Sequence, residues 1–134
     1  MNTTLSKAIT AGLFFLFIFL SGFWLSRSGK PYSAIIFNIH KLIGLAAGVF
    51  LIVTVCRVHR VTPLGPAQVA AIVVTVLIFV GLVAAGGLTS IDAAGQLGNV
   101  GQSARAAILA AHRLLPYLAV LSTAATLYLL LARR

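Results

Sequence analysis

Residues 67–88, AQVAAIVVTVLIFVGLVAAGGL, contain no charged side chain and decide the fold class. A helix of roughly 20 apolar residues, rising about 1.5 Å per residue, crosses the roughly 30 Å of hydrocarbon in a bilayer. The stretch is long enough to do so, and it follows Pro63 and Pro66, which break the chain before it. It therefore predicts one helix that spans a membrane.

The rest of the chain has the same character. Of its 134 residues 60% are hydrophobic and 8% are charged, whereas about a quarter of the residues of a soluble domain are charged. Asp92 is the only acid, and the basic residues stand singly or in pairs between apolar runs, as they do beside membrane spans. We therefore expect the chain to contact a lipid bilayer and not a nucleic acid, despite its formal net charge of +9. Cys56 is the only cysteine, which excludes an intramolecular disulfide.

Four apolar runs predict four transmembrane helices in a single domain of residues 1–134. The predicted spans are residues 8–26, 33–57, 67–88 and 103–132. The first run is long, rich in aromatic residues and without an Ala-x-Ala cleavage site, so we interpret it as a retained helix rather than a signal peptide. Short links after the first and second spans predict an all-α bundle of up-down-up-down topology.

Two further signals mark the boundaries of these spans. Pro31 suits the start of the second helix, because proline is favoured in the first turn. Residues 89–102 are rich in glycine and polar residues and contain Asp92. They predict the one substantial loop, which is long enough to act as a lid.

Two histidines lie in matching phrases, NIHKLIG at residues 38–44 and AAHRLLP at residues 110–116. A histidine in an apolar helix is costly unless a partner satisfies it, and ionisable residues inside a membrane are functional by default. His40 lies about 8 residues and His112 about 9 residues into its predicted helix, roughly 12–13 Å from the start at about 1.5 Å per residue. Because the second and fourth spans run in the same direction, we expect the two imidazoles at one depth, where they share one ligand.

Heme is the ligand that this pair favours. Two neutral imidazoles fill both axial positions of a heme iron and favour electron transfer. Zinc recruits three or four side chains, often with cysteine or carboxylate, and no predicted span contains a carboxylate. Chlorophyll-type pigments usually take one histidine each and explain the pair less well.

The residues around each histidine fit a flat, anionic macrocycle. The helix face that continues beyond each histidine carries small residues. The base that follows each histidine lies near a helix N-terminus, where the helix dipole also favours a negatively charged heme propionate. The same bases could instead be ordinary snorkelling residues, and the glycines could serve packing alone. The candidate iron ligands are His40 and His112, and the candidate heme-contacting residues are Lys41, Gly44, Gly48, Arg105, Arg113 and Pro116.

The phrases HKLIG at residues 40–44 and HRLLP at residues 112–116 resemble the heme-binding helices of prokaryotic membrane b-type cytochromes. These are the cytochrome b561-like four-helix bundles, which are related to the cytochrome subunits of hydrogenases and formate dehydrogenases. The resemblance covers the four-span layout and these two phrases. It implies an antiparallel bundle that holds heme b and transfers electrons to or from a quinone or a redox partner protein.

The chain departs from this family in the number of hemes. Its members often hold a second histidine pair at the other membrane face, where the fourth span here offers only Thr126 and Tyr128. His59 follows His40 by 19 residues, which is about 28 Å along a helix. We therefore expect one heme per chain and interpret His59 as a surface residue in a basic turn.

The basic residues also bear on orientation. Five are expected on the side of both termini and five on the opposite side, namely Lys7, Arg57, Arg60, Arg133 and Arg134 against Arg27, Lys30, Lys41, Arg105 and Arg113. If the two bases beside the histidines are assigned to heme, the positive-inside rule favours cytoplasmic termini. The expected location is the inner (plasma) membrane of a bacterium or archaeon.

Two functions compete with a cytochrome. A non-catalytic structural or anchor subunit of a larger respiratory or photosynthetic membrane complex fits the small size and apolar composition equally well. The two functions are compatible, because a heme subunit can anchor a catalytic partner or form a homo-oligomer. A small transporter is disfavoured, because no predicted span contains a carboxylate to relay protons or hold a cation. The sequence thus predicts an electron-transfer protein or a subunit of an oxidoreductase complex.

Overall fold

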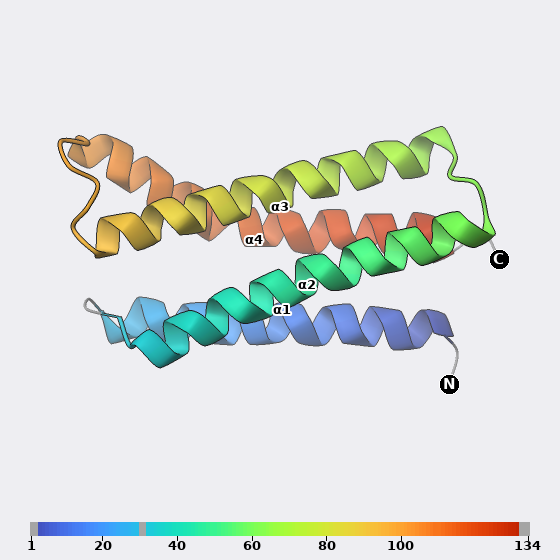
Figure 1. Ribbon diagram of the computed structural model, residues 1–134, viewed down its shortest axis with the longest axis horizontal. Helices are drawn as coiled ribbons and strands as arrows, with labels where there is room; N and C mark the ends of the chain where they lie inside the picture. Colours follow the sequence, from blue (N-terminus) through green and yellow to red (C-terminus); the bar gives the residue numbers. More distant parts are fainter. Residues whose placement is uncertain (1–2, 30–31, 132–134) are drawn as a thin grey trace. The chain divides into compact units, whose positions relative to one another are not determined.

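The computed structural model describes residues 3–29 and 32–131. Within this part the chain forms four α-helices and no strand: α1 (Thr3–Ser28), α2 (Ala34–Val61), α3 (Pro66–Ala93) and α4 (Gln102–Leu131) (Figure 1). All four helices are long and apolar enough to cross a membrane. The predicted all-α class with four membrane-length helices is therefore confirmed, and the chain is an integral membrane protein.

Several sequence-based expectations fall outside the described residues. They are the position of Pro31, the end of the last span at residue 132, and the positions of Lys30, Arg133 and Arg134.

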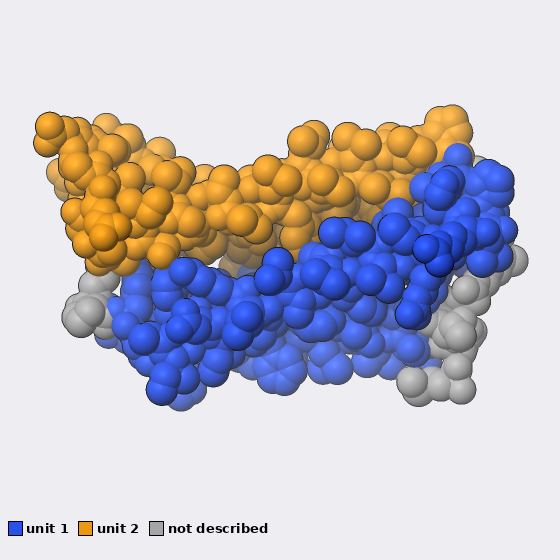
Figure 2. All heavy atoms as spheres, in the orientation of Figure 1, with its two compact units in different colours: residues 1–64, 130–134 blue, residues 65–129 orange. Residues whose placement is uncertain are grey.

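The chain divides into two compact units (Figure 2). Unit 1 comprises residues 1–64 and 130–134, and unit 2 comprises residues 65–129. Unit 1 is built on the α1–α2 hairpin and unit 2 on the α3–α4 hairpin, and within each hairpin the two helices run antiparallel (Figure 1). Each unit thus contributes one pair of spans with opposite directions.

One face of α1 is buried. Ala11, Phe15, Ile18 and Leu25 are all less than a tenth exposed, and their spacing of three, four and seven residues places them on a single helix face. α1 packs against α2, where the rings of Phe14 and Phe50 lie 5.7 Å apart. α1 is followed by Gly29, whose φ of 70° is a left-handed conformation that glycine adopts without steric cost.

Polar side chains join α3 and α4 in unit 2. The hydroxyl oxygens of Thr75 and Thr126 lie 2.9 Å apart, and both residues are buried. Gln68 accepts a hydrogen bond from the amide of Gly65 at 2.7 Å and donates one to the carbonyl of Leu129 at 2.8 Å. Hydrocarbon supplies no partner for such groups, so these bonds hold the two helices together.

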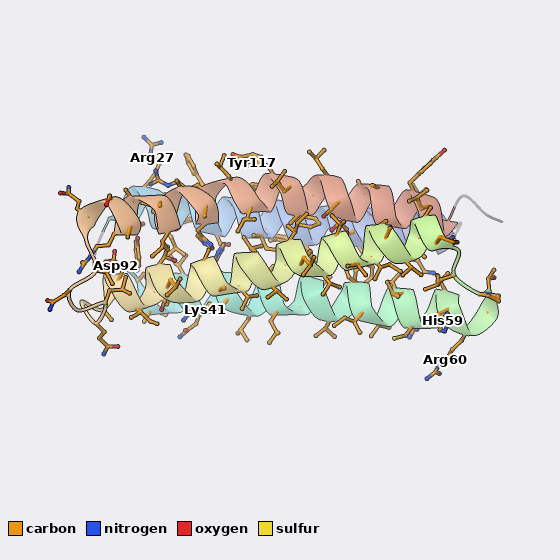
Figure 3. All side chains as sticks on the ribbon, turned by 90° about the horizontal axis from the view of Figure 1, so that it is seen from above. Arg27, Lys41, His59, Arg60, Asp92 and Tyr117 are labelled. Carbon is orange, nitrogen blue, oxygen red and sulfur yellow. The ribbon has the colours of Figure 1, made fainter. Side chains whose placement is uncertain are left out.

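The loop between α3 and α4 is shorter than the sequence predicts. α3 continues to Ala93 and α4 begins at Gln102, so the connection is residues 94–101 rather than 89–102. The prediction was wrong because the polar residues after Leu88 remain helical. The hydroxyl of Thr89 donates to the carbonyl of Gly86 at 2.8 Å, which satisfies it within the helix. Asp92 accordingly lies in the last turn of α3 (Figure 3).

Arg105 ties this loop to the start of α4. Its Nε donates to the carbonyl of Val100 at 3.0 Å, one terminal nitrogen to Asp92 at 3.0 Å, and the other to the carbonyl of Gly98 at 2.9 Å. Gly98 has a φ of 56°, so the backbone turn that presents this carbonyl suits glycine. The guanidinium that the sequence offered to a heme propionate is thus engaged by the loop.

Arg105→Lys is expected to loosen residues 94–101, because one ammonium group cannot reproduce the three-way planar contact of a guanidinium. A hydrogen bond to a charged group contributes about 1.5–3 kcal/mol, and the lower end applies to this partly exposed arginine. Amide hydrogen exchange in the loop should therefore accelerate about tenfold. Arg57→Lys, which changes an exposed arginine of α2, is the control. Unchanged exchange in Arg105→Lys would show that the loop does not depend on the guanidinium.

Candidate functional site

His40 lies on α2 with its ring half-buried against α1. Its Nδ1 atom is 2.9 Å from the hydroxyl oxygen of Ser21. The next residue of α1 is Gly22, where an added Cβ would lie 3.2 Å from Cε1 of the imidazole. Two consecutive residues of α1 therefore accommodate this ring. Ser21 forms a hydrogen bond with it, and Gly22 leaves the space that the ring occupies.

His112 lies on α4 in a corresponding setting in unit 2. A Cβ added at Gly86 of α3 would lie 3.0 Å from Cε1 and 3.5 Å from Nδ1 of the imidazole. The backbone of Leu82, one turn earlier on α3, also faces the ring. A Cβ at position 86 would be closer to the ring than is usual for Cβ contacts, so the imidazole would have to shift by a few tenths of an ångström to admit it.

The two hairpins place these contacts at closely similar positions. Gly22 is six residues before the end of α1 at Ser28, and Gly86 is seven residues before the end of α3 at Ala93. In each hairpin the second helix then returns a histidine onto that glycine. The two units therefore repeat one arrangement of a glycine on the first helix and an imidazole on the second.

The repeat continues along α2 and α4. An alanine follows each histidine by seven residues, and a threonine follows the alanine by another seven. All four of these residues are buried: Ala47 is 3%, Thr54 3%, Ala119 0% and Thr126 3% exposed. A spacing of seven residues keeps side chains on one helix face. Each residue of this pattern on α2 has its counterpart on α4 72 residues later (40 and 112, 47 and 119, 54 and 126). The pattern can be recognised in the sequence alone.

The depths counted from the helix starts differ more than the sequence predicts. His40 lies six residues after Ala34, the first residue of α2, and His112 lies ten residues after Gln102, the first residue of α4. A difference of four residues is about 6 Å along a helix, or one turn. The opening turn of α4 contains Arg105, which binds the loop, and this extends α4 on the N-terminal side of His112. The positions of Gly22 and Gly86, counted from the ends of α1 and α3, therefore agree more closely between the two hairpins than the positions of the histidines counted from the starts of α2 and α4.

The bases that follow the histidines are both exposed. Lys41 lies in the N-terminal part of α2 with its ammonium nitrogen 4.0 Å from the centre of the Phe37 ring (Figure 3). Arg113 is exposed on α4. Each base is therefore accessible on its own helix, immediately beside the histidine.

The small residues beyond the histidines leave room on their helices. A Cβ added at Gly44 would meet no other atom within 4 Å in the part of the chain that the structure describes. Gly48, one turn further on α2, is half-buried. Pro116 lies inside α4, half-buried, and has no amide hydrogen to donate to the carbonyl of His112.

His59 lies apart from this arrangement. It is exposed in the last turn of α2, beside Arg60, at the opposite end of that helix from Lys41 (Figure 3). This placement agrees with its interpretation as a surface residue.

Among the described residues the structure brings together two sets of side chains, one in each unit. Ser21 and Gly22 lie at His40, while Gly86 lies at His112. These three residues could not be predicted from the sequence, because their role depends on which helix face meets which histidine. No group of three or more His, Cys, Asp or Glu side chains is arranged to hold a metal ion within residues 3–29 and 32–131.

Comparison of the chain with protein-family models, with curated proteins and with solved structures found no match. The function of the chain is therefore inferred from the geometry of the two histidines.

Gly86→Ala is expected to destabilise the protein, because the new methyl group overlaps the space of the His112 ring. Overpacking of this kind costs about 1–3 kcal/mol of unfolding free energy. Gly22→Ala should cost less, since its added Cβ lies 3.2 Å rather than 3.0 Å from the facing Cε1. Denaturant titration of the protein in detergent micelles measures both.

Gly87→Ala is the matched control for these variants. A Cβ at position 87 meets nothing within 4 Å among the described residues, and alanine favours a helix over glycine by about 0.5–1 kcal/mol. This variant should therefore be as stable as the wild type or slightly more stable. Equal stability of the Gly86→Ala and Gly87→Ala variants would contradict the close packing at His112.

Proposed function

We propose that this chain is a membrane b-type cytochrome in which His40 and His112 are the axial ligands of one heme iron. The observation that carries the proposal is the repeated setting of the two histidines. Each hairpin presents one imidazole against a glycine of its first helix, with a buried alanine and threonine following at intervals of seven residues. In many transporter folds with internal repeats, the ligand site lies at the interface between the repeats.

The available donor atoms fit heme better than a bare metal ion. Two imidazoles complete the coordination of a heme iron, whose other four ligands belong to the macrocycle. Zinc usually takes three or four protein ligands, and the only acid of the chain, Asp92 in the last turn of α3, is paired with Arg105 of α4. The open space at Gly44, one turn beyond His40, is suited to the edge of a flat ring system.

The other candidate residues have supporting roles in this proposal. Lys41 and Arg113 would pair with the heme propionates, because each is an exposed base directly after a ligand histidine. Gly44, Gly48 and Pro116 would line the macrocycle. Arg105 is the least suited of the proposed set, since two of its guanidinium nitrogens already bond carbonyls of the loop and the third bonds Asp92 of α3.

A bound heme would supply one-electron transfer, and the chain would hold it within an apolar membrane layer. The proposed electron donor or acceptor is a quinone in the same bilayer or a redox partner protein. The proposed partners are the other subunits of a larger oxidoreductase complex or a second copy of the chain. We place the protein in the inner membrane of a bacterium or archaeon with cytoplasmic termini, which the positive-inside rule favours once Lys41 and Arg113 are assigned to heme.

The test is the heme content of the full-length chain after heme-replete expression. The pyridine hemochrome assay should give about one heme per chain, with visible bands that shift on reduction, as expected for bis-histidine ligation. His40→Ala and His112→Ala should each remove the heme. His59→Ala should retain it, because this exposed histidine at the end of α2 is not a proposed ligand.

Two results would count against the cytochrome. One is a folded wild-type protein without Soret absorption. The other is full heme retention in His40→Ala or His112→Ala with loss in His59→Ala, which would assign the iron to a different histidine.

A further inference from the structure

We propose that Ser21 fixes the tautomer of His40, so that Nδ1 carries the proton and Nε2 is the nitrogen that binds iron. Ser21 is thus a positioning residue, which acts on the ligand and does not touch the heme itself. The identity of the metal group rests on the proposed function, whereas the tautomer follows from the geometry of unit 1 alone.

The hydroxyl of Ser21 has three polar neighbours. Its oxygen lies 2.7 Å from the carbonyl oxygen of Phe17, 3.1 Å from that of Ile18 and 2.9 Å from Nδ1 of His40. A hydroxyl has one proton to donate, and a carbonyl oxygen can only accept. The shortest contact, to Phe17, is the usual back-bond of a serine inside a helix. The proton of Ser21 is therefore directed along α1 and away from the histidine.

The direction of that bond determines the proton on the imidazole. If the Ser21 hydrogen points at Phe17, the contact to His40 is a hydrogen bond only when Nδ1–H donates to the Ser21 oxygen. A neutral imidazole has one N–H, so Nε2 then carries the lone pair. Histidines that bind metals commonly donate their other N–H in this way, which orients the ring and makes the ligand nitrogen more basic.

Gly22 completes the placement of the ring. It follows Ser21 on α1, and an added Cβ there would lie 3.2 Å from Cε1 and 3.7 Å from Nδ1 of His40. Because Cε1 lies between the two ring nitrogens, the space that Gly22 leaves by having no Cβ lies beside the hydrogen bond and accommodates the imidazole there. Serine and glycine at adjacent positions therefore hold the ring with Nδ1 toward α1.

The second hairpin lacks this hydroxyl. The residue before Gly86 is Ala85, which takes the position that Ser21 has before Gly22. Ala85 is 8% exposed and offers no hydrogen-bond acceptor in its side chain. The two proposed ligands are consequently inequivalent, and a change at Ser21 should alter His40 while leaving His112 as it is.

The decisive experiment is 15N NMR of the histidine side chains in the full-length chain, prepared without added heme in lipid nanodiscs. The 15N shifts distinguish a protonated from an unprotonated ring nitrogen, and His40→Ala assigns the signals. We expect His40 of the wild type to be protonated on Nδ1 only. Ser21→Ala should convert it into a mixture of both tautomers, whereas Ser21→Thr, which keeps the hydroxyl, should retain the wild-type spectrum.

Ser122→Ala is the matched control. The hydroxyl of Ser122 also donates to a carbonyl of its own helix, that of Ala119 at 3.2 Å, and its loss should not change the His40 spectrum. A wild-type His40 protonated on Nε2 would overturn the proposal, as would a Ser21→Ala spectrum identical to that of the wild type. The wild-type measurement decides the question even where Ser21→Ala does not fold.

Heme-loaded protein supplies the second readout. Loss of the acceptor for Nδ1–H makes the imidazole a weaker donor, so Ser21→Ala should lower heme affinity about tenfold or more and raise the midpoint potential. A tenfold change in the ratio of oxidation states corresponds to 59 mV for one electron. A wild-type chain without heme refutes the proposed function and leaves the NMR result standing. An unchanged affinity and potential in a heme-binding Ser21→Ala chain refutes the role of Ser21 alone.

Discussion

Hydrocarbon offers no hydrogen-bond partner, so each polar group of a spanning helix must be satisfied by the protein. Among the described residues, most of the hydrogen-bonded hydroxyls are satisfied in one of two ways. Thr10 and Thr54 donate to carbonyls one turn earlier on their own helix. Thr75 and Thr126 bond one another between α3 and α4. The side chains that reach across a hairpin fix the register of its helices, and the residues around each histidine can be understood as part of the same requirement.

This constraint explains how much of the fold could be predicted from the sequence. Length and apolar composition were enough for the four spans, because a membrane-length helix needs little else. The same reliance on composition led to the wrong prediction for the end of α3. The polar residues after Leu88 were interpreted as a loop, but Thr89 bonds Gly86 within the helix and Asp92 bonds Arg105. Composition alone does not distinguish a polar residue that leaves a helix from one that is satisfied inside it.

The candidate site divides in a similar way. His40 and His112 stand out in the sequence because an imidazole is costly in an apolar helix. Ser21, Gly22 and Gly86 do not stand out, because serine and glycine are common in membrane helices and become informative only when a particular histidine faces them. The seven-residue pattern after each histidine was accessible from the sequence, yet it does not identify the facing glycine, which lies on a different helix in each hairpin.

The two hairpins share some features of the site and differ in others, and this difference bears on its purpose. Both have a glycine, an imidazole, a buried alanine and a buried threonine in the same order. Their hydrogen bonds differ: Ser21 bonds His40 where Ala85 has no hydroxyl, and Thr54 bonds its own helix where Thr126 bonds Thr75.

Packing against a glycine does not require an imidazole, since an apolar side chain would fill that space with a smaller desolvation cost. The property common to both positions is the imidazole ring with two nitrogens held at a glycine. An imidazole nitrogen at each position is what the proposed pair of axial ligands would require.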